Sequence, residues 1–301
     1  MPFLSIIITA HNCELTLAET LESVKKAIDF EKDVEVIVLN DSSYDKTQQI
    51  IERYAETFSS VQMREVQLKN VGRVRNIAVQ MARGEYITMV DGDDLLKPRS
   101  LRDAVAFLKQ QRPDLLLTHL IETRNFSVIN SDWTGFSPIK LPQHEAIRRF
   151  LIHKDFQAHL IGQFIRKDIY LCAPIPSMTC YEDFAVFPAF LMHSQNIWFQ
   201  KQGHYHYVKR ANSLSSVLDK TKIRHLINCT KRMERVFPSS FHWLVCCHWL
   251  DIYLKHAQLL THEQISIIEE KIKSTLSPGF FMSPDVRLSY KKKAIQALWK
   301  R

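Results

Sequence analysis

Short apolar runs rich in β-branched residues alternate with segments of helical periodicity through the N-terminal third of the chain. The apolar runs predict strands at 4–9, 34–39 and 86–90, and a further strand is predicted at 61–66. The periodic segments predict helices at 14–27, 44–58 and 70–81. Such regular alternation of strand and helix is typical of an α/β domain, in which a mostly parallel sheet carries helices on both faces.

The middle of the chain continues this pattern less regularly. A strand is predicted at 114–121 and a helix at 145–153, with a polar loop or hairpin at 125–142 between them. Trp133 and Phe136 in that loop either stack on a sugar ring or pack in the core. Packing is favoured, because large aromatic side chains bury the most area.

Beyond residue 220 the alternation ends and helical periodicity takes over. Helices are predicted at 223–236, 241–257 and 263–276. The segment 241–250 is the most apolar of these and indicates a buried helix. Its tryptophans, together with the basic residues near the C-terminus (Lys291, Lys292, Lys293, Lys300 and Arg301), keep a membrane-facing helix open as the alternative.

Polar clusters follow three of the predicted strands, at 11–12, 40–43 and 91–94. The carboxyl ends of parallel strands meet at one edge of a sheet, where α/β proteins bind their ligands. Arg75 lies near the start of a predicted helix between the second and third clusters, where cations and backbone N–H groups could meet a diphosphate.

The third cluster holds three carboxylates, Asp91, Asp93 and Asp94, with Gly92 between the first two. Crowded carboxylates raise one another's pKa, so the arrangement is costly unless a cation or a basic side chain lies among them. Asp91 and Asp93 alternate along an extended end and can point to one object. Hard oxygen ligands suit Mg²⁺ or Mn²⁺. The alternative is a solvated acidic turn that caps the following helix.

Composition narrows the classes of protein further. The 301 residues carry a net charge of +8, which favours an anionic partner: nucleic acid, an anionic membrane or a phosphorylated small molecule. Neither a dinucleotide-binding GxGxxG nor a P-loop is present. The six cysteines have no metal-binding spacing, which indicates free thiols. Without a signal-peptide pattern or a spanning apolar window, we expect a cytoplasmic protein.

The clusters together resemble the motifs of the family 2 glycosyltransferases, which have the GT-A fold. The resemblance covers residues 3 to about 110 and rests on SIIITAHN at 5–12, VIVLNDSSYD at 36–45, NVGRVRN at 70–76 and ARGEYITMVDGDD at 82–94. Two later stretches, Glu182-Asp183 and HYHYVKRANSLS at 204–215, resemble the family's base motif and its loop over the donor diphosphate. We therefore expect a GT-A domain at 1–220 and a helical C-terminal region at 221–301.

The resemblance also implies roles for individual residues. Asp183 would be the general base, Asp93 with Asp91 would hold Mn²⁺ or Mg²⁺, and Asp41 would accept a hydrogen bond from uracil. The implied donor-binding residues are Thr9, His11, Asn12, Asp41, Arg75, Asp91, Gly92, Lys209, Arg210 and Ser213. His204 and His206 either bind the metal or lie in a half-buried strand, and the strand is favoured.

Three residues depart from the family pattern: Thr9 replaces the usual Pro, His11 the usual Tyr, and Asn40 the first Asp of the second motif. The implied activity is inverting hexosyl or N-acetylhexosaminyl transfer from a nucleotide sugar, with UDP as the expected nucleotide. The acceptor would be a glycan or a lipid-linked glycan of a bacterial lipopolysaccharide, O-antigen or capsule, made at the inner face of the membrane. No nucleic acid is implied as a partner. The alternatives are a metal-dependent nucleotidyltransferase and a non-catalytic nucleotide-sugar binding module.

Overall fold

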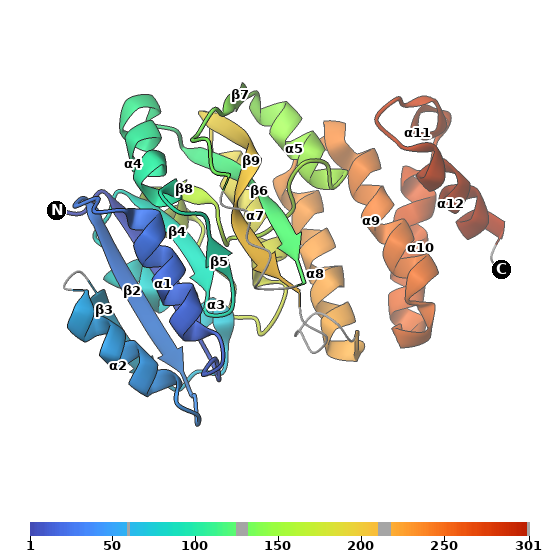
Figure 1. Ribbon diagram of the computed structural model, residues 1–301. Helices are drawn as coiled ribbons and strands as arrows, with labels where there is room; N and C mark the ends of the chain where they lie inside the picture. Colours follow the sequence, from blue (N-terminus) through green and yellow to red (C-terminus); the bar gives the residue numbers. More distant parts are fainter. Residues whose placement is uncertain (59–60, 125–131, 210–217, 300–301) are drawn as a thin grey trace.

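The computed structural model describes residues 1–58, 61–124, 132–209 and 218–299, and these form a mixed α/β fold around one sheet (Figure 1). The strands are β1 (Leu4–Ala10), β2 (Val34–Asp41), β3 (Val61–Val66), β4 (Tyr86–Asp91), β5 (Leu95–Leu96), β6 (Leu115–Thr123), β7 (Ile139–Leu141), β8 (Phe164–Arg166) and β9 (Ile197–Val208). The strands predicted in the N-terminal third are all confirmed. Strands β1, β2 and β4 are apolar runs between polar segments, whereas β3 (VQMREV) lies at the edge of the sheet and is partly exposed.

The described strands follow the order β3-β2-β1-β4-β8-β6-β9-β5, and β7 pairs with β9. Strands β1, β2, β3 and β4 are parallel to one another, and β6 is parallel to β9. Strand β8 runs antiparallel to both β4 and β6, so it joins two parallel halves. The short strands β5 and β7 are antiparallel to β9. The mostly parallel sheet is therefore confirmed, with antiparallel pairing confined to the later strands.

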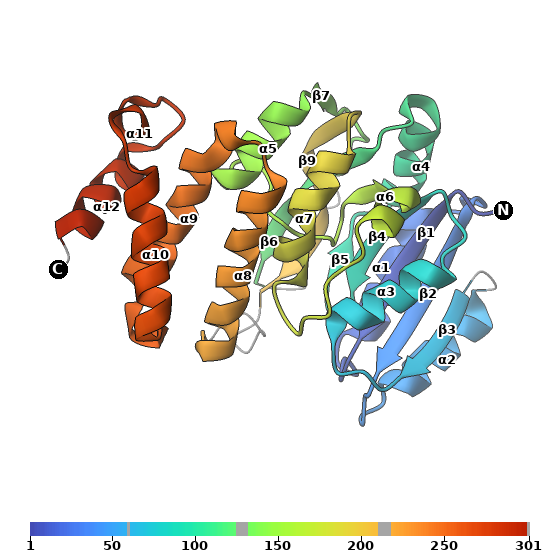
Figure 2. The ribbon, with the colours of Figure 1, turned by 180° about the vertical axis from the view of Figure 1, so that it is seen from behind.

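Helices cover both faces of the sheet. They are α1 (Leu17–Ile28), α2 (Thr47–Thr57), α3 (Val71–Met81), α4 (Ser100–Gln111), α5 (Gln143–Leu151), α6 (Lys167–Cys172) and α7 (Glu182–His193). Helices α1 and α2 lie on the face seen in Figure 1, and α3 and α7 lie on the face seen in Figure 2. Residues along β1, β2 and β4 are almost wholly buried between these layers.

The register aligns the carboxyl ends of the central strands. Thr9 of β1 lies opposite Leu39 of β2 and opposite Asp91 of β4, and Ala10 lies opposite Asn40. The polar residues that follow these strands therefore meet at one edge of the sheet, the lower edge in Figure 1.

The C-terminal region is helical, as predicted. It comprises α8 (Lys220–Val236), α9 (His242–Lys255), α10 (His262–Thr275), α11 (Pro278–Met282) and α12 (Leu288–Trp299), with short 3₁₀ turns at Ser239–Phe241 and Ala257–Leu259. Helix α8 packs on α7, and α9 packs against α8, α10 and α12. A domain boundary at residue 220 stays a prediction, since buried apolar residues of both parts form one continuous core.

Helix α9 resolves the choice between a buried and a membrane-facing helix. Its side chains Leu244, Val245, Cys246, Trp249 and Leu250 are all buried against the neighbouring helices. The buried helix is confirmed, and a membrane-facing role for this segment is wrong. Within the described residues, no helix has the length and apolar character needed to cross a membrane.

The predicted loop at 125–142 lies partly outside the described residues, which resume at Asp132. Trp133 is buried, packs edge-on against Phe136 and donates its indole N–H to Asp103 at 2.8 Å. Phe136 packs in turn on Phe164 of β8. The packing role of both aromatic residues is confirmed.

Candidate active site

A buried arginine links two of the predicted chemical motifs. The guanidinium of Arg75 pairs with Asp91 at 2.9 Å and with Glu182 on its other side. Thr9 donates its hydroxyl to the same Asp91 oxygen at 3.2 Å. Burial opposes the charge on Arg75, but Asp91, Glu182 and Asp183 outweigh it and hold the pKa of Arg75 above its ordinary value. Arg75 is therefore the basic side chain that the carboxylate cluster was expected to need.

Helix α3, which carries Arg75, also fixes the segment that leads into α7. Asn70 caps the helix, and Gly72 lies so close to this segment that a Cβ there would meet the carbonyl oxygen of Pro176 at 2.1 Å. Asn76 donates to the backbone oxygen of Ile175 and accepts from its N–H at 3.0 Å. The motif at 70–76 therefore joins α3 to the segment before Glu182, and so places the two acidic clusters side by side.

Asp183, the expected general base, lies in the first turn of α7 with its side chain 23% exposed. Its Oδ1 accepts the backbone N–H of Phe184 at 2.7 Å, and its Oδ2 lies 3.5 Å from Nδ1 of His159. Burial raises the pKa of the neighbouring Glu182, while Arg75 acts in the opposite direction. The two residues of the Glu182-Asp183 motif therefore have different environments. Glu182 is a buried partner of Arg75, and Asp183 is the carboxylate that solvent or an acceptor can reach.

The carboxylates that end β4 occupy different environments. Asp94 is buried and accepts the hydroxyl of Tyr205 at 2.6 Å and the N–H of Val208 at 2.8 Å. Burial, with the charges of Asp91 and Asp93, raises the pKa of Asp94, as crowding predicted. Asp93 is only half-buried. Asp94 therefore anchors β9 to the strand end, whereas Asp91 and Asp93 are both partly exposed.

This donor set suits a metal shared with a ligand. Asp93 and Asp91 offer hard oxygens, and Mg²⁺ or Mn²⁺ is often held by one or two carboxylates plus substrate phosphates. Over the described ranges, no group of three or more His, Cys, Asp or Glu residues could hold a metal by itself. Asp91 and Asp93 are of the residue type that would hold such a cation together with a diphosphate, and their role as ligands stays a prediction.

His204 and His206 lie in β9 and belong to the core. His204 packs on Phe164 with ring centroids 5.3 Å apart, and burial lowers its pKa to about 3. Successive side chains of a strand alternate between faces, so Tyr205 faces Asp94 while its two histidine neighbours face away. The strand interpretation is confirmed.

Hydrogen bonds join the loop after β1 to the loop after β2. His11 Nδ1 lies 2.6 Å from the carbonyl oxygen of Asp41. Asn12, at a positive φ of 50°, accepts the N–H of Tyr44 at 3.0 Å and donates its own N–H to the hydroxyl of Ser43. The first two polar clusters are thus brought together, with His11 and Asn12 at their junction.

Asp41, the expected uracil contact, is largely engaged by the protein. Its Oδ1 accepts the N–H groups of Leu68 and Lys69 at 2.8 and 3.0 Å and the hydroxyl of Ser42 at 3.0 Å. Burial works against its ionisation, yet these hydrogen bonds outweigh burial and lower the pKa of Asp41. Its Oδ2 accepts only the N–H of Asn70 among its described contacts, at 3.2 Å, so this oxygen is the one positioned for a further donor.

The other expected donor-binding residues are Gly92, Lys209, Arg210, Ser213 and Arg75, and only some of them lie among the described residues. Gly92 lies against β1, and a Cβ there would meet the carbonyl oxygen of Thr9 at 3.1 Å. Lys209, just after β9, is half-exposed and pairs with Glu122 at 2.6 Å. Arg210 and Ser213 lie outside the described residues. Arg75 faces two carboxylates, so direct contact with a diphosphate stays a prediction for it.

Sequence reasoning missed Tyr205, whose hydroxyl also lies 3.1 Å from the backbone nitrogen of Asp91. It missed His159 and the structural roles of Gly72 and Asn76 as well. A signal existed for the last two, since both lie in the motif at 70–76, but their partners at 175–178 carry no motif of their own.

Solved structures share this arrangement of a mostly parallel sheet with helices on both faces. Staphylococcus aureus TarS, residues 1–349 in complex with UDP-GlcNAc, has a TM-score of 0.61 at 22% identity, over 98% of this chain and 79% of that one. The mannosyltransferase PcManGT from Pyrobaculum calidifontis, in complex with GDP-Man and Mn²⁺, has a TM-score of 0.61 at 15% identity, over 99% and 86%. The fold is therefore the GT-A fold.

The profile of Glycosyl transferase family 2 matches residues 5–157, and the chain belongs to this family. The poly(ribitol-phosphate) beta-N-acetylglucosaminyltransferase TarS of S. aureus is 37% identical over 115 residues, 38% of this chain and 20% of that protein. The putative glycosyltransferase EpsE of Bacillus subtilis is 39% identical over 114 residues, 37% of this chain and 40% of that protein. The chain thus matches well under two thirds of the length of these relatives.

Proposed function

We propose that this protein is an inverting glycosyltransferase that moves a sugar from a nucleoside diphosphate to a hydroxyl of a cell-surface glycan. The observation that carries the proposal is the Arg75 bridge, which brings Asp91 of the strand-end cluster and Glu182-Asp183 of α7 to one site. The attacking oxygen and the anomeric carbon must come to within about 3–3.5 Å of each other. The bridge supports the proposal because it joins the donor-side cluster to the segment that carries the proposed base.

Asp183 takes the proton from the acceptor hydroxyl as its oxygen attacks the anomeric carbon. The nucleoside diphosphate leaves from the opposite face of the sugar and carries away the bonding electrons. A cation on Asp93 and Asp91 would neutralise charge on the departing diphosphate when bound. Lys209, with Arg210 and Ser213 further along, is the proposed protein contact of the diphosphate oxygens, while Arg75 holds the two acidic clusters in place.

The proposed donor is a UDP-sugar, with UDP-N-acetylglucosamine as the first candidate, because the neighbouring TarS structure is a complex with that compound. The name of TarS also gives its acceptor as poly(ribitol-phosphate), and a matching protein of B. subtilis is named for minor teichoic acid biosynthesis. A teichoic-acid-type acceptor is therefore favoured over lipopolysaccharide. We place the reaction in the cytoplasm, at the inner face of the membrane.

A panel of nucleotide sugars tests the proposed donor. We expect UDP and UDP-sugars to raise the melting temperature in the presence of Mn²⁺ more than GDP or dTDP compounds do, since only bound ligand stabilises the folded state. Asp41→Ala should weaken binding of UDP and UDP-sugar alike in calorimetry, because Oδ2 of Asp41 is the proposed uracil acceptor. A wild-type preference for GDP or dTDP would contradict the assignment of UDP as the donor nucleotide.

The metal assignment is tested by Asp93→Asn. The amide keeps the size of the side chain but removes the charge that the cation needs, so transfer and the Mn²⁺ dependence of donor binding should both be lost. The melting temperature without ligand should stay close to that of the wild type, because Asp93 is only half-buried. Unchanged turnover in this variant would exclude Asp93 as a metal ligand.

A further inference from the structure

Helix α12, at the end of the C-terminal region most distant from β1–β4 (Figure 1), exposes an apolar stripe. Leu288, Ile295 and Trp299 are 68%, 49% and 84% exposed. Their spacing of seven and four residues places all three on one side of the helix. Leu298 beside them is 44% exposed. Single exposed apolar residues are ordinary, but a continuous stripe along one helix marks an interaction surface.

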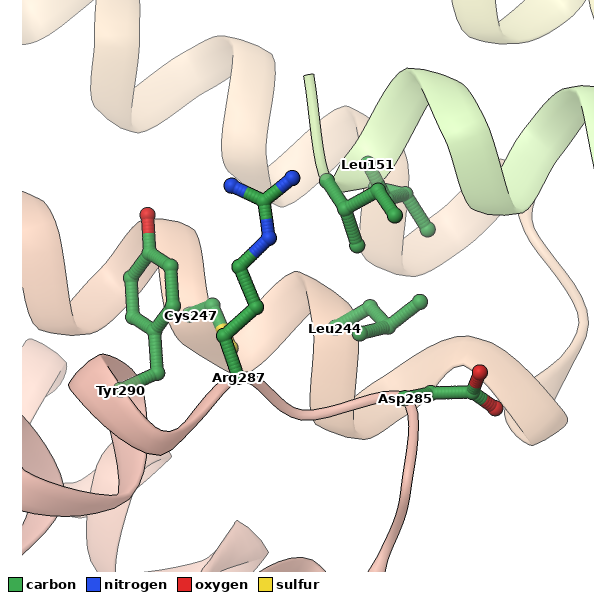
Figure 3. A pocket seen from close by; sticks show the side chains of 7 residues that line it. Leu151, Leu244, Cys247, Asp285, Arg287 and Tyr290 are labelled. Carbon is green, nitrogen blue, oxygen red and sulfur yellow. The ribbon is translucent and has the colours of Figure 1, made fainter. Parts of the chain in front are cut away.

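Contacts on the opposite side of α12 determine the orientation of the helix, and so of the apolar stripe. Ala294 is fully buried, the hydroxyl of Tyr290 donates to Asp251 of α9 at 2.9 Å, and Lys293 pairs with the same carboxylate. The turn that precedes α12 packs against α9 and the end of α5, where Arg287 lies close to Leu151 (Figure 3). Because these contacts hold the inner side, the apolar stripe stays directed outward.

Two lysines flank the stripe. Lys291 and Lys292 follow Leu288 by three and four residues, so they project on either side of the line from Leu288 to Ile295. Among the described residues, no carboxylate forms an ion pair with either of them. The aliphatic stem of a lysine can lie along an apolar surface while its ammonium group reaches outward to an anion. Apolar residues in the centre and cations at both edges are the pattern of a helix that lies in a membrane interface.

We propose that the outer face of α12 binds the surface of an anionic lipid membrane, with Leu288, Ile295 and Trp299 in the headgroup region and Lys291 and Lys292 against lipid phosphates. The charges favour this partner over a second copy of the chain, because two such faces packed together would bring like charges into contact. The proposal deepens the function proposed above by naming the surface that meets a membrane, although its evidence lies in α12 alone.

Sedimentation of the full-length protein with vesicles tests this proposal. Vesicles of phosphatidylglycerol mixed with phosphatidylcholine are compared with vesicles of phosphatidylcholine alone, at low and at high salt. We expect the wild type to partition to the anionic vesicles and to be released by salt, since the Debye length falls to about 3 Å at 1 M. Wild-type protein that stays in the supernatant with anionic vesicles at low salt would overturn the proposal.

Substitutions on α12 locate the surface. Lys291→Gln with Lys292→Gln should weaken partition roughly 25-fold, since each cation near anionic lipid contributes roughly fivefold. The triple change Leu288→Ser, Ile295→Ser and Trp299→Ser should abolish partition. Phe30→Ser is the matched control, because Phe30 is 94% exposed in the turn after α1, and it should partition like the wild type. Equal partition of all four proteins would show that α12 is not the surface.

Two further measurements separate the alternatives. A blue shift of tryptophan emission on vesicle binding should disappear in Trp299→Phe if this side chain enters the interface. Sedimentation velocity without lipid tests whether a second copy of the chain binds this face instead. A wild-type dimer that the triple change dissociates would contradict the membrane proposal. Hydrolysis of a soluble UDP-sugar should be the same in the α12 variants and the wild type, so failure of the membrane proposal and failure of the proposed activity give different results.

Discussion

Asp183→Asn should lower turnover roughly 10²- to 10⁴-fold, the usual contribution of a general base, while donor affinity stays close to that of the wild type. The amide keeps the shape of the side chain and its contact with the Phe184 N–H, but it cannot take the acceptor proton. Single-turnover kinetics with saturating donor measure this loss directly.

The matched control is Asp168→Asn, which removes a carboxylate that is 57% exposed in α6 and lies outside the proposed site. Its turnover should be unchanged. If Asp183→Asn instead abolished donor binding but kept wild-type turnover at saturation, Asp183 would belong to the donor side and the base would have to be another group.

Arg75→Met should destabilise the folded protein by about 3–5 kcal/mol, because removing one partner of a buried ion pair leaves the remaining charges uncompensated. The Arg75 side chain is only 5% exposed, and both Asp91 and Glu182 depend on it. Activity should be lost as well, since Glu182 and its neighbour Asp183 would no longer be held beside the strand end. Urea unfolding followed by circular dichroism measures the stability change.

Two companion variants separate charge compensation from packing. Arg112→Met removes an arginine whose side chain is 56% exposed and paired with Glu85, and it should unfold like the wild type. Adding Glu182→Gln to Arg75→Met removes one of the uncompensated charges, so the double variant should recover part of the lost stability. An Arg75→Met protein as stable as the wild type would show that the carboxylates find other partners.

The N-terminal half of the fold could be predicted from sequence because its central strands β1, β2 and β4 are mostly apolar and almost wholly buried. The order of the later strands could not be predicted, since the antiparallel β8 is three residues long and β5 only two. Such short strands carry no periodic signal, and tertiary pairing alone defines them. Helix α12 was interpreted as a basic tail for a related reason: three consecutive lysines hide the apolar spacing of Leu288, Ile295 and Trp299.

The candidate site was predictable in its residue types but only partly in its geometry. The strand-end rule brought the clusters at 11–12, 40–43 and 91–94 together, and parallel register explains why that worked. The rule does not predict which carboxylates are buried in hydrogen bonds or ion pairs with other side chains of the protein. Asp94 and Glu182 turned out to be buried partners of Tyr205 and Arg75, and that division depends on side chains from distant segments.

The stereochemistry of donor hydrolysis tests the proposed chemistry most directly. With water in place of the acceptor, an α-linked donor such as UDP-N-acetylglucosamine should first release the β anomer of the free sugar, in a reaction that needs Mn²⁺ and is slowed by Asp183→Asn. Proton NMR at early times, before the anomers equilibrate, distinguishes the two products. Initial release of the α anomer, or equal hydrolysis by wild type and Asp183→Asn, would contradict an inverting transfer with Asp183 as the base.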